Sequence, residues 1–137
     1  MIKIFLDTNI ILDFIDNDRD NHKITQHLFI LLDNNNYQVV ISEDMLNTLY
    51  YLSKKDKTSM LRFLQIIQDK WLISPFGKSV VKKSIETALT KKLDLEDVLQ
   101  CLCAKQNNCQ TLITSDNYFD DCGIKIQNAA EFLASHN

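Results

Sequence analysis

The chain has 137 residues, of which 45% are hydrophobic and 24% are charged, and its formal net charge is -3. This length and apolar content predict a single domain, residues 1–137, with its own core. The acidic balance excludes a polybasic protein that holds nucleic acid by charge alone. Because no apolar run approaches the roughly 18 residues of a membrane span, we expect no membrane role.

The first apolar stretch ends in a carboxylate. Residues 2–6 are typical of a buried strand that stops at Asp7, and residues 10–15 then indicate the first turns of a helix. Burial of Asp7 without compensation would cost several kcal/mol, so this carboxylate needs hydrogen-bond donors or a cation. The simpler alternative is that Asp7 or Thr8 caps the helix that follows.

Strands and helices alternate along the remaining chain. The apolar spacing predicts helices over 22–36, 44–55, 57–70, 80–92, 94–102 and 128–135, and short strands over 38–41, 71–74, 111–114 and 124–126. There are only two glycines and one proline, and no repeat or linker separates the segments. The pattern therefore predicts an α/β fold with a mainly parallel sheet of four to five strands, covered by helices on both faces.

The four cysteines lack the spacing of a familiar metal or redox motif. Cys101, Cys103, Cys109 and Cys122 include no C-x-x-C pair, which disfavours a zinc site or a redox couple. Cys101 and Cys103 fall in a helical pattern where cysteine packs as a small hydrophobe. With no secretory segment expected before the first strand, we interpret the cysteines as reduced and the protein as cytoplasmic.

Three carboxylates distant in the sequence are expected at one edge of the sheet. Asp7 leaves the first strand, and Asp116 follows the fourth strand by two residues. In an open α/β sheet the functional crevice lies outside the carboxyl ends of the strands, where the strand order reverses. Asp97 lies in the first turn of the preceding helix, one turn after Asp94, so these two acids should point the same way.

Converging acids predict a divalent metal ion and a phosphate ester substrate. Carboxylates in one crevice repel one another unless a cation lies among them, and all-oxygen ligands select a hard ion such as Mg2+ or Mn2+. Such an ion neutralises charge on a phosphate and lowers the pKa of a water molecule. Asn9, with Thr114 or Ser115, would orient a carboxylate. In the simpler alternative, Asp94 and Asp97 are acids favoured at a helix start and Asp116 is a turn former.

The chain resembles the PIN domain family over its whole length. The matching segments are FLDTNIILD (5–13), DLEDVLQCLCAKQNNC (94–109), LITSDNYF (112–119) and NAAEFL (128–133). The resemblance implies a three-layer α/β/α fold and a metal-dependent nuclease, similar to the VapC-like RNA-cleaving toxins of toxin-antitoxin pairs. It assigns Asp7, Asp97 and Asp116 to the metal site, with Asn9 and Thr114 as polar neighbours.

One position departs from the family pattern. Most PIN domains carry a glutamate about six residues after the serine that ends the second strand, but Thr48 occupies that place here. We expect that Glu43 and Asp44 cannot easily replace it, because they lie more than a turn earlier and face another way. The chain also resembles a subgroup of PIN domains that has a similar Leu-Tyr-Tyr helix and lacks this glutamate. A weakened site, a single-ion site and a lost activity therefore all remain open.

The favoured hypothesis is a Mg2+- or Mn2+-dependent endoribonuclease that leaves a 5′-phosphate and a 3′-hydroxyl. One alternative is a PIN fold that binds RNA or protein without cleavage. A phosphoryl transferase that forms an aspartyl-phosphate is disfavoured, because it requires an Asp-x-Asp-Gly-Thr sequence after the first strand, where this chain has Asn9 and Ile10.

The resemblance also implies partners, namely an RNA substrate, a small antitoxin protein and a second copy in a homodimer. Exposed apolar residues of the first two helices, or Tyr50 and Tyr51, are candidate contacts for a protein partner. Several lysines near helix ends could border an RNA path, although a solvated surface is the better account of them: 54, 55, 57, 78, 82, 83, 91 and 92.

Overall fold

The computed structural model describes residues 1–53, 56–117, 119–120 and 122–136. Within these residues one sheet contains five strands: β1 (Lys3–Leu6), β2 (Gln38–Ser42), β3 (Leu72–Ser74), β4 (Thr111–Ile113) and β5 (Lys125–Gln127). Their order is β3-β2-β1-β4-β5, and every neighbouring pair is parallel. The predicted α/β class with a parallel sheet is therefore confirmed.

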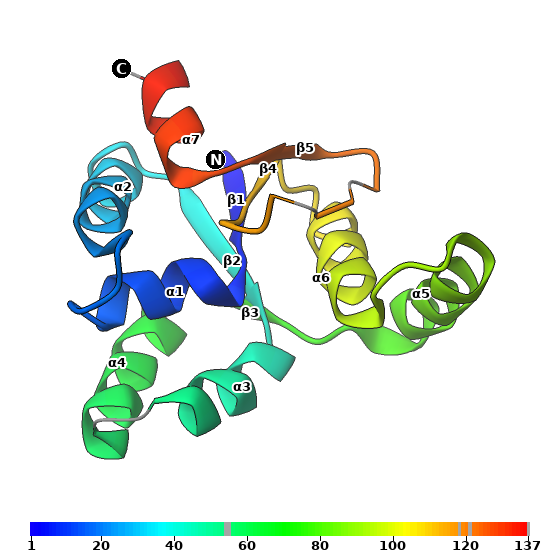
Figure 1. Cartoon of the computed structure of the whole chain (residues 1–137), viewed down its shortest axis with the longest axis horizontal. Coiled ribbons are helices and arrows are strands. Elements are labelled where there is room, and N and C mark those ends of the chain that lie inside the picture. The colour runs from blue at the N-terminus through cyan, green and yellow to red at the C-terminus, as the bar shows by residue number, and fades with distance from the viewer. Residues whose placement is uncertain (54–55, 118, 121, 137) are drawn as a thin grey trace.

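Helices cover both faces of this sheet. In the same residues they are α1 (Thr8–Ile15), α2 (His22–Asn34), α3 (Asp44–Leu52), α4 (Lys57–Lys70), α5 (Gly77–Lys91), α6 (Leu95–Gln106) and α7 (Ala129–Ser135). Figure 1 shows α1, α2 and α7 on one side of the sheet and α6 on the other, with α5 packed outside α6. This is the predicted three-layer arrangement. None of the described helices is both long and apolar enough to cross a membrane.

The central strand is apolar on both faces because helices lie on both sides of it. Ile4, Phe5 and Leu6 of β1 are completely buried, and the apolar residues of the neighbouring strands β2 and β4 join them in one core. A continuous apolar run, rather than an alternating one, is typical of a strand in a parallel sheet with two covered faces. This burial fixes the end of β1, and therefore the position of Asp7.

The strand order reverses between β1 and β4. The chain first builds β1, β2 and β3 in one direction and then returns through α5 and α6 to place β4 on the other side of β1. Leu6 is paired in register with Ile113, and the backbone N–H of Asp7 donates to the carbonyl of Ile113 at 2.9 Å. Asp7 and Thr114 consequently leave the sheet side by side at its switch point.

Two helices begin earlier than the apolar spacing predicted. Helix α1 starts at Thr8 instead of residue 10, and α5 starts at Gly77 instead of residue 80. The spacing marks only positions that face the core, such as Val80, so it misses first turns that carry no buried apolar residue. The lysines expected at the end of α3, residues 54 and 55, lie outside the described residues.

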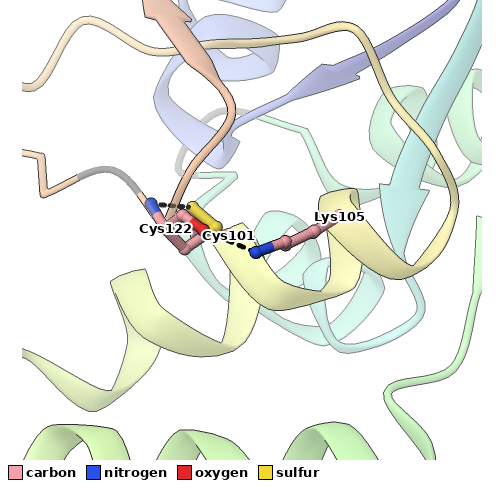
Figure 2. The surroundings of a disulfide bond; sticks show 3 residues. All are labelled: Cys101, Lys105 and Cys122. Carbon is pink, nitrogen blue, oxygen red and sulfur yellow. Dashed lines mark hydrogen bonds between the residues drawn. A yellow bond between two sulfur atoms is a disulfide. The ribbon is translucent and has the colours of Figure 1, made fainter.

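The expectation that all cysteines are reduced was wrong for two of them. Cys101 of α6 and Cys122 form a disulfide (Figure 2) with their Cα atoms 6.0 Å apart. Cys103 and Cys109 are free thiols and buried, as the helical pattern predicted for Cys103. Sequence spacing did not reveal the pair, because its partners are 21 residues apart and the fold alone brings α6 against the segment that follows β4.

Candidate metal and catalytic site

Asp7 both caps a helix and contributes to a polar network. Its carboxylate oxygen Oδ1 accepts the backbone N–H of Thr8 at 2.9 Å, so Asp7 is the N-cap of α1. Its other oxygen, Oδ2, accepts the hydroxyl of Thr114 at 2.8 Å and the side-chain amide of Asn9 at 3.2 Å. The capping alternative is therefore correct for one oxygen, while the second oxygen is held toward the end of β4.

The network continues from Thr114 to Asp116. The Thr114 hydroxyl accepts the amide of Asn9 at 3.3 Å and the backbone N–H of Asp116 at 3.1 Å. Ser115 takes part through its backbone, because its N–H donates to Oδ1 of Asn9 at 3.1 Å. These bonds join the ends of β1 and β4, so Asp7 and Asp116 lie at the same edge of the sheet, as the sequence predicted.

Asp97 faces the same edge from the first turn of α6. Burial raises its pKa to about 6, and the negative charges of Asp94, Asp7, Asp116 and Glu96 add to the rise. Asp94 is the N-cap of α6 and accepts the backbone N–H of Asp97 at 3.1 Å. The helix-start interpretation therefore holds for Asp94, whereas Asp97 is electrostatically coupled to Asp7 and Asp116.

The environment of Asp7 acts on its pKa in opposing directions. Burial raises the pKa of Asp7 above its ordinary value, and the charge of Asp116 raises it further. The hydrogen bonds from Thr114, the Thr8 backbone and Asn9 act in the opposite direction, because each favours the ionised form. Repulsion among coupled carboxylates is what a bound cation would relieve.

The donor set suits a hard divalent ion in its chemistry. The coupled groups are carboxylates, so the ligands on offer are oxygens. Among the described residues, no three His, Cys, Asp or Glu side chains are arranged to hold a metal ion in this conformation. Asp97 and Asp116 are only partly buried.

Glu96 is an acid that the sequence reasoning did not select, and it is electrostatically coupled to Asp7. Burial, followed by the charges of Asp7, Asp94 and Asp44, raises the pKa of Glu96. Asp44 on α3 is exposed, and its charge makes the smallest contribution to this rise. Thr48 is half-buried on α3, four residues after Asp44. Positions four apart share a helix face, so Thr48 and Asp44 lie on the same side of α3.

The residues predicted to contact RNA or a protein partner differ in their surroundings. Lys57 donates to the carbonyl of Tyr50 at 2.7 Å and lies over its ring, so it has a structural role. Tyr51 is 77% exposed on α3. The five lysines of the α5 region are all exposed: 78, 82, 83, 91 and 92.

Comparison with known proteins gives concordant matches. A family model described as "PIN domain" matches residues 3–118 of the chain. The chain is 36% identical over 138 residues to "Ribonuclease VapC1" of Aquifex aeolicus (strain VF5), and the match covers 98% of this chain and 96% of that protein.

Solved structures of similar fold come from several bacteria. VapC20 of Mycobacterium tuberculosis, titled a sarcin-ricin loop cleaving toxin, matches with a TM-score of 0.73 and 12% identity over 88% of this chain and 95% of that one. DNA-bound VapBC of Salmonella typhimurium matches with a TM-score of 0.71 and 17% identity over 94% of this chain and 99% of that one. VapBC2 of Rickettsia felis, bound to a promoter DNA fragment, matches with a TM-score of 0.69 and 21% identity over 93% of this chain and 98% of that one. At these identities the likeness establishes a shared fold.

Proposed function

This chain belongs to the PIN domain family, and on that premise we propose that it is a metal-dependent endoribonuclease of the VapC-like toxin class. The proposal is carried by one observation, the network that joins Asp7, Asn9, Thr114 and Asp116 at the switch point of the sheet opposite Asp97. The similarity to a ribonuclease along nearly the whole chain supports RNA as the substrate.

Asp7, Asp97 and Asp116 would hold Mg2+ or Mn2+. The coupled charges of the three carboxylates and the raised pKa values of Asp7 and Asp97 support this assignment, since a cation would relieve both effects. When bound, the ion would neutralise charge on a phosphodiester and make a water molecule more acidic. Metal binding needs these side chains ionised, so it would release a proton from Asp97 at a pH near or below its pKa of about 6.

The chain's own contribution is orientation. Thr114 and Asn9 both donate to Oδ2 of Asp7, which fixes the direction of this carboxylate before any substrate arrives. The N–H of Asp116 is bound to the same hydroxyl, so the backbone that carries Asp116 is fixed relative to Asp7. Groups held in this way need little rearrangement during a reaction, which is the advantage of a preorganised site.

A second candidate is a PIN fold that binds RNA or protein with weakened or no cleavage. Thr48 favours this candidate, because the family's usual second acid is missing there. Glu96 opposes it, because its carboxylate adds a negative charge that is coupled to Asp7.

We also propose a small antitoxin as a protein partner and a homodimer as the assembly. A toxin-antitoxin complex from Klebsiella pneumoniae is among the solved structures that share this fold. An apolar groove of about 620 Å³ between α1, α2 and α4 is lined by Phe14, Phe63 and Trp71, with Ile30 and Ile66 more than half exposed on its border. Such a groove suits the apolar face of a partner helix. An RNA substrate makes the cytoplasm the expected compartment.

The test is cleavage of mixed RNA by purified protein with Mn2+ or Mg2+. The Asp7→Asn variant should cleave RNA more than about a hundredfold more slowly than wild-type protein, and chelation of the metal should abolish cleavage. Asp33→Asn is the matched control, because Asp33 is an exposed carboxylate on α2. Equal cleavage by the wild-type protein and the Asp7 variant would identify a contaminating nuclease and refute the proposal.

A further inference from the structure

The disulfide connects the two chain segments that carry candidate site acids. Cys101 lies on α6 one turn after Asp97, and Cys122 lies in the segment that follows Asp116. Figure 2 shows Cys122 against the side of α6, next to Cys101 and Lys105. The bond therefore holds the positions of Asp97 and Asp116 relative to each other through a short covalent path.

Noncovalent contacts keep the two cysteines together as well. The backbone N–H of Cys122 donates to Sγ of Cys101 at 3.1 Å, and Nζ of Lys105 donates to the carbonyl of Cys122 at 3.1 Å. These contacts do not depend on the covalent bond, so the thiols would remain within reach of each other after reduction. A pair held in this way can open and close repeatedly.

The other two cysteines are poor candidates for redox chemistry. Cys103 and Cys109 are buried free thiols, and burial raises the pKa of both, that of Cys109 to about 12. Since the thiolate is the reactive form, these residues stay unreactive near neutral pH. Cys101 is 1% exposed whereas Cys122 is half-buried, so Cys122 is the sulfur that a reagent reaches first.

We propose that Cys101 and Cys122 form a reversible redox site and that the bonded state is the more active form of the nuclease. The second part rests on the proposed function. In the oxidised state the segment after Asp116 is fixed to α6, with the carboxylates of Asp97 and Asp116 coupled. In the reduced state that segment keeps only its noncovalent contacts, so the acids are held less firmly.

The oxidant is a small disulfide such as oxidised glutathione. The Cys122 thiolate attacks one of its sulfurs, which breaks the glutathione S–S bond and releases one glutathione as a thiol after protonation. The Cys101 thiol then loses its proton and attacks the sulfur of Cys122 in the mixed disulfide, releasing the second glutathione. Two electrons pass from the protein to the small disulfide, and reduction by excess glutathione reverses both steps.

The experiment equilibrates the full chain in glutathione buffers of varied ratio. Alkylation and mass spectrometry count the thiols, with two expected in the oxidised protein and all four cysteines free in the reduced protein. RNA cleavage with Mn2+ is measured on the same samples. Reduction should lower the rate by about twofold to thirtyfold, the range for coupling between distant positions, and reoxidation should restore it.

Two variants complete the design. Cys122→Ser should cleave at the rate of reduced wild-type protein in every buffer, whereas Cys109→Ala should keep the redox dependence. Equal wild-type rates at two and four thiols would overturn the regulatory role, and four thiols in every buffer would overturn the redox site itself. Absence of cleavage in both states, with the thiol count still changing, would refute the nuclease and its regulation but leave the reversible pair established.

Discussion

Thr114 offers the sharpest test of the candidate site, because its hydroxyl is the point where Asp7, Asn9 and Asp116 meet. The variant Thr114→Val keeps the shape of the side chain and removes the hydroxyl. It eliminates the 2.8 Å bond to Asp7 and the 3.1 Å bond from the N–H of Asp116. Thr114 is 2% exposed, so water cannot easily replace the lost partner.

The expected cost follows from these bonds. A hydrogen bond to a charged group contributes about 1.5–3 kcal/mol and a neutral one about 1 kcal/mol, so the free energy of unfolding should fall by about 2–4 kcal/mol. The Thr114 bond is the largest of the effects that lower the pKa of Asp7, so that pKa should rise further in the variant. Because Asp7 also loses its orientation, cleavage should slow by about tenfold to a hundredfold.

Urea unfolding at neutral pH measures the stability, and cleavage of RNA with Mn2+ measures the activity. Thr8→Val is the matched control, because the buried Thr8 hydroxyl has no hydrogen-bond partner among the described residues. That variant should change stability by less than about 0.5 kcal/mol or increase it. If both valine variants lost the same stability and kept wild-type activity, the proposed role of the Thr114 hydroxyl would be refuted.

Three further predictions concern charge and the disulfide. Asp97→Asn should raise the unfolding free energy of metal-free protein at pH 7 by at most about 1 kcal/mol. The unfolding free energy of the wild-type protein should fall by the same amount as pH rises from the ordinary pKa of 3.8 to about 6, because the folded state keeps a proton on Asp97 in that range that the unfolded state has lost. Chemical denaturation across this pH range measures the effect of the substitution and the pH dependence, and a variant less stable than wild type at pH 7 would contradict the reasoning. Thr48→Glu should tighten Mn2+ binding by about tenfold through added negative charge, as measured by calorimetry, and unchanged affinity would place Thr48 away from the metal. Reduction of Cys101–Cys122, 21 residues apart, should lower the unfolding free energy by about 3 kcal/mol, and superimposable denaturation curves would contradict that.

Local sequence signals were sufficient for the fold class and for the strand-end acids. The apolar run before Asp7 and the short strand before Asp116 show in the residues themselves, because a strand buried on both faces needs a continuous apolar stretch. Parallel strands send their carboxyl ends to one edge, so the meeting of these two acids follows from the pattern. The single domain over residues 1–137 stays a prediction.

Only the tertiary structure decided which residues face one another. Helical spacing cannot show that Glu96 on α6 is electrostatically coupled to Asp7, because that depends on how α6 lies against the sheet edge. Likewise, Cys101 and Cys122 have no motif in common, and they meet because β4 returns beside β1 and carries the following segment against α6. The sequence by itself determined the strands and the acids at their ends, since these depend on neighbours in the chain. The disulfide and the coupling of Glu96 to Asp7 depend on the approach of distant segments, which arises only when the sheet has assembled.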